Sequence, residues 1–456
     1  MIRRRSGHAQ IPVDKQRSVK AKLATVNILA SMMRLPAFVR RHKALFAILG
    51  LGLAVRLAVL LYYLSTHGWQ AETWEYEIIA RNLLAGRGFT IEHNNALYSS
   101  FVVPVFPLVC ALLHLIGGSG FAWYYVFHLS TAAGIMVLTY AIAHRWYGVH
   151  TAGLAALLVA LEPGLIVYYA YKVDVVALST FLLLLGVYLF AVTMDTWNRS
   201  LAVLVGLVAG IGVLTRPDLI GFLVIPAAWI IAERKRFQEA CWVAALILFA
   251  TIVVMTPWFV RNYHLHGKFA LTTITGETLW IGNNPNATGT AVTLDNKSQL
   301  GAAPEEFRNK VYSLQEFEQD AFFKEQAFNY IAADPVGFLS RALAKIYYFW
   351  WFSPTFAWRH YDWVPSPLIV IYRILYGLLL GFGVYGVWVG MRGPRDAIRR
   401  VTLYLLALPM AIAIIHSINF VEGRHRVLVM PIILLFAAHG MMEAIGKHRS
   451  LEKASR

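Results

Sequence analysis

Charged residues are scarce in this chain of 456 residues, because Asp, Glu, Lys and Arg make up 14% of it while 58% is hydrophobic. A soluble globular protein has about 25% charged residues. A chain of this size with so few charges has too little polar surface to cover a water-soluble domain. The mean hydropathy of +0.55 indicates instead that lipid covers most of the folded surface.

The sequence also lacks the short motifs of several common enzyme classes. It has no Walker loop, no dinucleotide-binding glycine fingerprint, no His-Glu-x-x-His and no Gly-x-Ser-x-Gly. Its two cysteines, Cys110 and Cys241, each lie within an apolar run, so we expect neither a disulfide nor a cysteine-based metal site. The energy for any reaction must then come with an activated substrate.

The formal net charge of +16 could suggest a nucleic-acid partner, but the positions of the basic residues argue against one. Lys and Arg cluster in short segments between apolar runs, which is typical of cytoplasmic loops that face anionic lipid. The chain contains no recognisable nucleic-acid-binding module. We therefore expect the lipid bilayer, and not nucleic acid, as the partner of these charges.

Apolar runs of about 17–25 residues predict membrane-spanning helices. Ten such runs are present, at residues 43–64, 122–144, 151–170, 173–193, 200–215, 217–232, 239–259, 366–391, 400–416 and 426–443. Two further apolar stretches, 101–117 and 338–353, are short or interrupted by proline, and we interpret them as interfacial or re-entrant. The expected fold class is an all-α polytopic membrane protein.

Ten crossings with a cytoplasmic N-terminus place most loop Lys and Arg residues on the cytoplasmic side, as the positive-inside rule requires. Both termini are then cytoplasmic, and two longer loops lie outside. Within the second of these loops, residues 304–334 have a helical hydrophobic period that stops at Asp334-Pro335. The expected organisation is a basic N-terminal segment (1–42), a transmembrane module (43–260) with a first outer loop (65–121), a second outer loop region with amphipathic helices (261–365), C-terminal transmembrane helices (366–443) and a cytoplasmic tail (444–456).

Two acidic groups are candidates for chemistry. Glu72, Glu75 and Glu77 open a predicted helix that Gly86 closes in the first outer loop; the alternative is that they are ordinary acidic residues stabilising a helix N-terminus. Asp174 stands at the outer end of a predicted span, where an ionisable group is usually functional. Its alternatives are an ion pair with nearby Lys172 or a helix cap.

A third group of candidates is cationic and lies at or near the outer ends of predicted spans. Arginine forks match phosphate oxygens well, so this set is suited to hold a lipid phosphate. For each arginine taken alone, the alternative is a side chain that extends to the membrane interface. The group comprises Arg56, Arg216, Arg261, Arg424 and Arg426.

The order of these motifs resembles the GT-C type glycosyltransferases that use a polyprenyl-phosphate sugar, among them the lipid A aminoarabinose transferase and the protein O-mannosyltransferases. No single motif is specific, but their order and spacing cover roughly residues 43–445. The matching segments are Glu72-x-x-x-Tyr76-x-x-x-Ala80-x-Asn82-Leu-x-x-Gly86-x-Gly88-Phe, Pro104-Val-Phe-Pro107, Glu162-Pro163, Arg216-Pro217, Pro257-Trp-x-x-Arg261-Asn262-Tyr, Gly282-Asn283-Asn284-Pro285 and Gly423-Arg424-His-Arg426.

This resemblance implies a GT-C bundle of about 10 to 13 transmembrane helices in the cell inner membrane, with its active site on the periplasmic side. The implied activity is inverting transfer of a hexose or pentose from a donor such as undecaprenyl phosphate-sugar to a lipid (including lipopolysaccharide), glycan or protein acceptor. Glu72 and Asp174 take the family's catalytic positions. The family residue is usually Asp where this chain has Glu72, so Glu75 remains a rival.

The resemblance also suggests which residues hold the donor. No metal ligand cluster is visible in the sequence, although a divalent cation at Glu72 and Asp174 is compatible with it. Tyr76, Asn283 and Asn284 are expected in substrate-facing loops. The residues expected at the donor phosphate are Arg81, Lys172, Arg216, Arg261, Arg424 and Arg426.

Two other functions fit parts of the pattern. A transporter or flippase of a lipid-linked sugar would use similar arginines and carboxylates without making bonds, but transporters usually show internal repeats with paired broken helices, and none stands out here. A non-catalytic membrane scaffold leaves the intramembrane Arg56 and the clustered carboxylates unexplained. Sugar transfer is therefore the function that the sequence favours.

Overall fold

The structure, a computed structural model, describes residues 42–68, 75–118, 120–233, 236–355, 366–393 and 396–454. Its elements are almost all helices. They are α3 (Lys43–His67), α4 (Glu75–Leu84), β1 (Ile91–His93), β2 (Ala96–Tyr98), α5 (Val105–Gly117), α6 (Ala122–Tyr147), α7 (Val149–Leu161), α8 (Pro163–Ala170), α9 (Val176–Thr196), α10 (Arg199–Val213), the 3-10 helix η1 (Pro217–Leu223), α11 (Val224–Ala232), α12 (Phe237–His266), α13 (Thr275–Ile281), α14 (Glu305–Tyr312), α15 (Glu316–Ala333), α16 (Pro335–Trp350), α18 (Ser366–Arg392), α19 (Asp396–Ile418), α20 (Gly423–Val427) and α21 (Met430–Ala454).

Each of the ten predicted spans coincides with helix in the structure. Among the described residues, six helices are long and apolar enough to cross a membrane, and the bent pair α7–α8 makes a seventh. Three shorter apolar segments, Arg199–Val213, Pro217–Ile231 and Met430–Gly446, occupy the remaining predicted spans. The expected class of all-α polytopic membrane protein is thereby confirmed.

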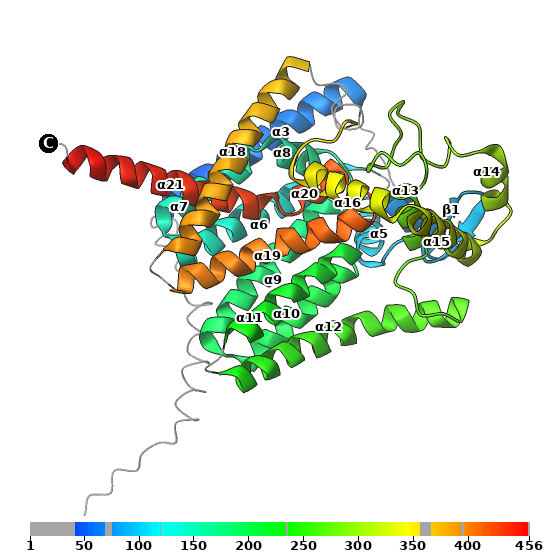
Figure 1. Ribbon diagram of the computed structural model, residues 1–456, viewed down its shortest axis with the longest axis horizontal. Helices are drawn as coiled ribbons and strands as arrows, with labels where there is room; N and C mark the ends of the chain where they lie inside the picture. Colours follow the sequence, from blue (N-terminus) through cyan, green and yellow to red (C-terminus); the bar gives the residue numbers. More distant parts are fainter. Residues whose placement is uncertain are drawn as a thin grey trace, which may run out of the picture.

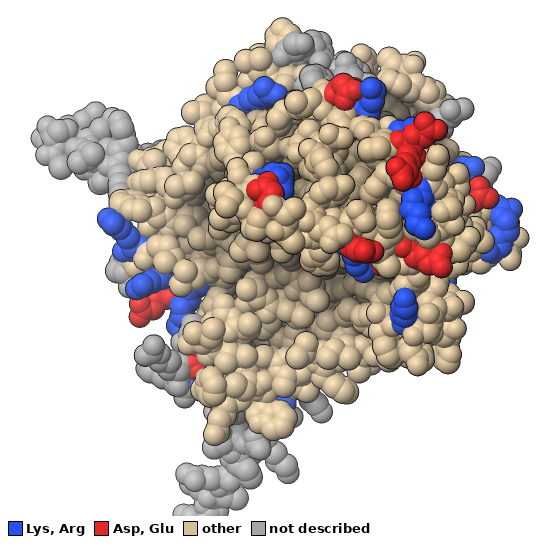
Figure 2. Space-filling model, turned by 45° about the vertical axis from the view of Figure 1, so that its right-hand side comes forward, with Lys and Arg blue, Asp and Glu red and all other residues tan. Residues whose placement is uncertain are grey.

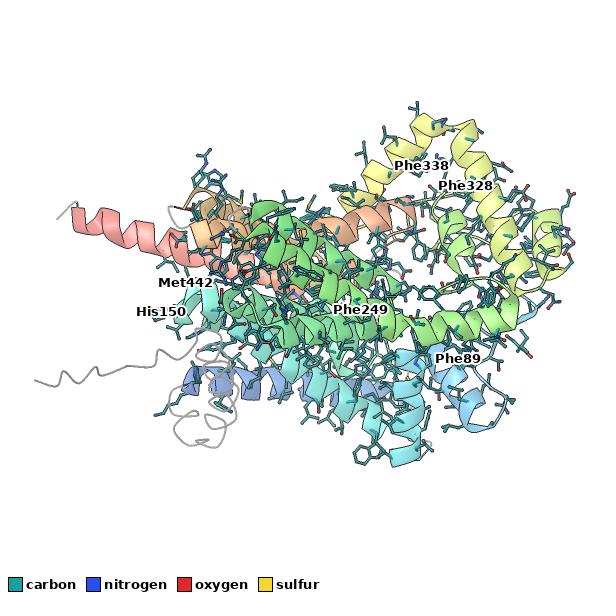
Figure 3. The ribbon with its side chains drawn as sticks, turned by 90° about the horizontal axis from the view of Figure 1, so that it is seen from below. Phe89, His150, Phe249, Phe328, Phe338 and Met442 are labelled. Carbon is teal, nitrogen blue, oxygen red and sulfur yellow. The ribbon has the colours of Figure 1, made fainter. Side chains whose placement is uncertain are left out.

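The bundle and the loop elements lie at different ends of the molecule. In Figure 1, helices α13 to α15 and strand β1 gather at the right, while the C-terminus projects at the left. Figure 3 shows the same polarity, with Phe328 and Phe338 of α15 and α16 at one end and His150 and Met442 of α7 and α21 at the other. We call the end with α13–α15 the loop end.

Surface chemistry follows this division. On the face in Figure 2, charged side chains gather on the right-hand side and in a smaller group at the left edge, and the surface between them is mostly uncharged. Large apolar side chains of α12, such as Trp242 and Phe249, are about two-thirds exposed (67% and 66%). Exposure of this kind along a long apolar helix is expected where lipid replaces water as the solvent.

The bend between α7 and α8 is built by Glu162 and Pro163. The two helices meet at 59°, and Pro163 stands at the first position of α8, where its missing N–H is not needed. The Glu162 carboxylate caps α8 by accepting the Leu165 N–H (2.6 Å), and it also accepts the Tyr372 hydroxyl (2.7 Å). This bend lets the short helix α8 carry the chain to Asp174.

Arg56 stabilises the same bend. Pro163 cannot donate to the carbonyl of Val159, and Arg56 donates to this carbonyl (3.1 Å) and to that of Ala160 (2.8 Å) instead. The side chain is fully buried in the bundle. The sequence grouped Arg56 with arginines suited to a phosphate, but its partners in the structure are backbone carbonyls of a broken helix.

The first part of helix α21 lies inside the bundle, where its residues from Met430 to Ala438 are all buried. It packs backbone to backbone against α18 at two glycines. A Cβ added at Gly386 would lie 2.0 Å from the Phe436 carbonyl oxygen, and one at Gly440 would lie 2.2 Å from that of Phe382. Close helix approach through small residues is a common basis of packing in membranes.

We therefore expect Gly386→Ala to destabilise the protein, although alanine ordinarily favours a helix over glycine. The added methyl group collides with backbone, and overpacking of this kind costs about 1–3 kcal/mol. Gly381→Ala in the same helix is the matched control, because a Cβ there meets nothing within 4 Å. Thermal unfolding in detergent tests the pair, and equal melting temperatures would contradict this packing.

Two local features differ from the sequence-based expectation. A short antiparallel hairpin, in which β1 pairs with β2, interrupts the all-α pattern, and its turn residues Asn94 and Asn95 both have positive φ (47° and 62°). The helical stretch expected over 304–334 is two helices, α14 and α15, because Gln315 and Glu318 form a capping box that starts α15 anew. The predicted end of this stretch at Asp334 is confirmed, because α15 ends there and Pro335 begins α16.

Candidate active site

Asp174 lies in the short non-helical segment between α8 and α9. Its backbone N–H donates to the Lys172 carbonyl (3.0 Å), and its Oδ1 accepts the N–H of Val176 (2.9 Å) at the start of α9. The residue is only 4% exposed. One carboxylate oxygen thus caps the helix, as the simpler sequence interpretation expected, while Oδ2 lies 3.9 Å from Nη1 of Arg424.

Glu75 is the first residue of α4 and brings a second carboxyl group to the same place. The residue keeps some exposure, but its carboxyl group is surrounded by protein, and this burial raises its pKa above the ordinary value. Arg424 opposes that rise and Asp174 adds to it, so both lie within electrostatic reach of Glu75. Glu75, Asp174 and Arg424 come from three segments that are far apart in the sequence.

Arg424 is held in α20 by the residue that precedes the helix. Glu422 forms a capping box with His425 at the start of α20, and its Oε2 lies 2.8 Å from Nε of Arg424. Burial acts to lower the Arg424 pKa, but Glu422 and Asp174 outweigh it and hold the pKa above its ordinary value. Arg424 therefore stays charged and stands between the carboxylates of Glu422 and Asp174.

Tyr76 adds a hydroxyl group beside these charges. Burial raises its pKa well above the ordinary value, and Glu75 and Asp174 raise it further. Its ring packs edge-on against Phe106 of α5, with ring centroids 5.1 Å apart. This packing fixes the start of α4 against α5 and so helps to place Glu75.

Arg216 and Asp218 form a buried ion pair at the start of η1. Nε of Arg216 lies 2.9 Å from Oδ2 of Asp218, and each residue is 8% exposed. Arg216 is also within electrostatic reach of Tyr76. Of the expected phosphate-binding arginines, Arg216 and Arg424 are thus the two that the structure brings close to the start of α4.

The other expected cations have protein partners of their own. Arg81 pairs with Glu77 on α4, and Arg261 of α12 donates to the Ser99 carbonyl (2.9 Å). Arg426 lies over the ring of Tyr376 (4.3 Å), and the buried Lys172 lies 5.6 Å from the ring of Tyr168. Their proposed role at the donor phosphate stays a prediction.

Asn283 and Asn284, expected in a substrate-facing loop, are buried after α13. Asn283 donates to the carbonyl of Ile418 (2.7 Å), and Asn284 donates to that of Trp280 (3.0 Å). Lys345 of α16 donates to the carbonyl of Asn419 (2.7 Å) beside them. These bonds fix the chain that leads from α19 into Glu422.

Lys345 was not anticipated from the sequence. It is fully buried, and burial, assisted by Arg341, lowers its pKa to about 7. Asp218, His416, His425 and Glu422 were also not singled out as site residues. Asp218 and Glu422 adjoin motif arginines in the sequence, which is a usable signal, whereas a single histidine in an apolar helix gives none.

Glu72, the first choice for the catalytic carboxylate, lies outside the described residues. Within the described ranges, no group of three or more His, Cys, Asp or Glu side chains is arranged to hold a metal ion. The cation that faces both Glu75 and Asp174 is Arg424. In the described site the Arg424 guanidinium therefore lies 3.9 Å from the Asp174 carboxylate, and the Glu75 carboxyl group is within electrostatic reach of both.

Comparison with known proteins identifies the fold that holds these residues. Residues 102–259 match the family model described as dolichyl-phosphate-mannose-protein mannosyltransferase. The oligosaccharyltransferase AglB from Archaeoglobus fulgidus, solved with an inhibitory peptide and a dolichol-phosphate, superposes with a TM-score of 0.52 at 12% identity, covering 91% of this chain and 52% of that chain. Its apo form gives 0.53 at 14% identity, covering 90% and 52%. The chain has the GT-C fold.

The GT-C fold expected from the sequence is thus confirmed. ArnT from Cupriavidus metallidurans, bound to undecaprenyl phosphate, also matches over 84% of this chain and 77% of that chain at 15% identity, but its TM-score of 0.38 is too low to argue from. No curated protein sequence matches the chain significantly. The chain spans about half the length of the AglB structures, at 52%, and their likeness carries the GT-C fold alone.

The buried carboxyl group of Glu75 predicts a specific pH dependence of stability. Its pKa is raised in the folded protein, so its stabilising contribution is complete below the ordinary pKa and is lost as pH rises through the folded value. We expect Glu75→Gln to remove this loss of stability at rising pH, so that the variant unfolds at a higher temperature than wild type at neutral pH. Melting curves recorded across pH test this prediction. Glu92→Gln, at an exposed hairpin position, is the control. The same dependence of melting temperature on pH in both variants would refute it.

Proposed function

We propose that this protein is a membrane glycosyltransferase that moves a sugar from a polyprenyl-phosphate carrier to an acceptor. The observation that carries the proposal is the convergence of Glu75, Asp174 and Arg424 in a GT-C fold. A general base and a phosphate-binding cation are the two groups that such a transfer needs. The dolichol-phosphate in the AglB structure supports a polyprenyl-type carrier.

The proposed reaction is a single displacement with inversion at the anomeric carbon. The acceptor oxygen forms a bond to that carbon as the bond to the phosphate oxygen breaks, and the electron pair leaves with the polyprenyl phosphate. A carboxylate, Glu72, Glu75 or Asp174, takes the acceptor proton, a role worth about 10²–10⁴-fold in rate. If the acceptor is itself a phosphate, no base is required and the carboxylates orient it.

Arg424 is suited to stabilise the departing phosphate. Negative charge grows on the phosphate oxygens as the bond breaks, and a fixed cation in a water-poor site stabilises it without reorganising. The Arg424 side chain is 23% exposed and is already oriented by Glu422. The carboxyl of Glu75 and the guanidinium of Arg424 would then lie on the acceptor and donor sides of the reacting carbon.

We further propose that the site faces the extracytoplasmic side of the inner membrane and that both termini are cytoplasmic. The loop end and the C-terminus lie at opposite ends of the molecule (Figure 1), and the positive-inside pattern of the sequence supports this orientation. The acceptor, whether lipid, glycan or protein, would approach from the loop end. The prenyl tail would lie against the apolar helices of the bundle.

The test uses purified full-length protein in nanodiscs with polyprenyl phosphates that carry radiolabelled hexose or pentose. A membrane-envelope extract supplies acceptors, and thin-layer chromatography detects free polyprenyl phosphate together with labelled product. We expect both to appear together. The transporter alternative predicts movement of the intact donor across proteoliposomes with no polyprenyl phosphate released, and that result would overturn the proposal.

A further inference from the structure

Two buried histidines stack face to face, and one of them directly follows Arg424 in the chain. His416 lies in the last turn of α19 and His425 lies in α20, and their ring centroids are 3.6 Å apart with an interplanar angle of 14°. They are 9% and 4% exposed. The roles set out above for Glu75, Asp174 and Arg424 use neither ring.

Hydrogen bonds from the two rings to neighbouring residues determine which ring nitrogens carry a proton. Nε2 of His416 lies 2.8 Å from Oδ2 of Asp218, and a carboxylate can only accept, so this nitrogen carries a proton. Nδ1 of His425 is 3.2 Å from the backbone N–H of Glu422, which can only donate, so this nitrogen carries none. The geometry therefore requires a neutral His425.

His425 in turn fixes Glu422. The side chain of Glu422 accepts from the backbone of His425 while the ring of His425 accepts from the backbone of Glu422, so each residue holds the other. Glu422 is 2.8 Å from Nε of Arg424, and Nη1 of Arg424 is 3.9 Å from Asp174. A continuous set of contacts thus runs from Asp218 through both rings to the proposed active site.

We propose that Asp218, His416 and His425 are positioning residues that hold Glu422 and Arg424 in place, and that protonation of His425 releases them. This inference rests on the proposed function. A proton on Nδ1 turns the acceptor of the Glu422 N–H into a second donor, which breaks the bond. A charge on both rings would also place two cations 3.6 Å apart.

The surrounding charges set the balance of this switch. The carboxylates of Asp218 and Glu422 lie beside the ring pair and favour its protonation, whereas burial of both rings and the nearby Arg216 and Arg424 oppose it. A free histidine ordinarily titrates close to neutral pH, so its surroundings decide whether it is charged there. Transfer should therefore decline on acidification as Arg424 loses its support.

The experiment compares two substitutions at one position. His425→Asn keeps a side-chain oxygen that can accept the Glu422 N–H but does not titrate, whereas His425→Ala has no acceptor. We expect wild-type kcat to fall between about pH 8 and pH 5. In His425→Asn the fall should begin at lower pH, where only protonation of the catalytic carboxylate remains. His425→Ala should lose kcat by about tenfold or more at every pH, as a misplaced catalytic group does. His264→Asn, at an exposed position of α12, is the control.

A second readout does not depend on transfer. In protein labelled with ¹⁵N-histidine and ¹⁵N-arginine, Nδ1 of His425 should resonate as an unprotonated nitrogen at neutral pH, and the Nε signal of Arg424 should move in His425→Ala but not in His264→Asn. An imidazolium His425 at neutral pH, or an unmoved Arg424 signal, overturns the inference whether or not sugar is transferred. Wild-type transfer whose acid limb lies at the same pH in His425→Asn overturns it as well, while absence of all wild-type transfer counts against the proposed function alone.

Discussion

Asp174→Asn is expected to lower sugar transfer by at least about 10²-fold, the lower end of the range for removal of a general base. Asparagine can still accept the Val176 N–H that caps α9, so the start of the helix is preserved. The substitution removes the negative charge that faces Arg424 and the ability to take a proton. The measurement is the initial rate of labelled product formation under saturating donor.

The controls separate a lost catalytic group from a general loss of charge. Asp295→Asn changes an exposed aspartate that pairs with Lys297 after α13, and it should keep wild-type activity. Melting temperatures of both variants show whether either has unfolded. Full activity in a folded Asp174→Asn variant would contradict the assignment of this residue.

Glu72→Gln and Glu75→Gln complete the comparison. Glu75 is the carboxyl group that the structure places with Asp174 and Arg424, so we expect its variant to lose activity by a similar factor. If Glu72→Gln is the more damaging of the two, the base lies before α4 and Glu75 serves to orient Arg424. If all three carboxylate variants remain fully active, the proposed site is wrong.

The sequence predicted the membrane helices well because lipid imposes a simple rule on them. A run of about twenty apolar residues with satisfied backbone bonds has few alternatives to a helix. The end of α4 followed from Gly86, which adopts a positive φ of 74° two residues after Leu84. Local chemistry alone determines features of this kind.

Other features depend on contacts that no local pattern records. The strands β1 and β2 have three residues each, which is too short for an alternating pattern to stand out. Arg56 and Arg261 have the residue type and the position of a phosphate ligand, but the fold supplies carbonyl partners to both. For both arginines these carbonyl partners lie roughly a hundred residues or more away in the sequence.

The candidate site, too, could be predicted from the sequence only in part. The sequence identified the three residues separately: Glu75 as an acidic residue opening a helix of the first outer loop, and Asp174 and Arg424 by residue type and position near the end of a span. It could not show that Glu422 orients Arg424 or that two histidines stack on each other, because α19 and α20 are turned toward η1 only by the folded bundle. The resemblance to GT-C enzymes supplied the expectation that Glu72 converges with Asp174, with Glu75 as its rival.

Arg424→Gln should reduce transfer by about 10²–10³-fold, the scale measured when one preorganised donor to a developing negative charge is removed. Glutamine keeps part of the length and some hydrogen bonding but no charge, so Glu422 and Asp174 lose the cation that now faces both of them. The loss should appear in kcat more than in the KM for the donor, because the phosphate gains charge only as the bond breaks.

Two comparisons make that result specific to the leaving group. Arg236→Gln removes an exposed arginine that pairs with Glu239 at the start of α12 and should be neutral. Donors whose phosphate leaves more readily should lose less activity in Arg424→Gln than ordinary donors do, since they depend less on the cation. An equal loss for both kinds of donor would mean that Arg424 acts before the bond breaks, by holding Asp174 and Glu75 together, and the arginine would then belong to the acceptor side of the site.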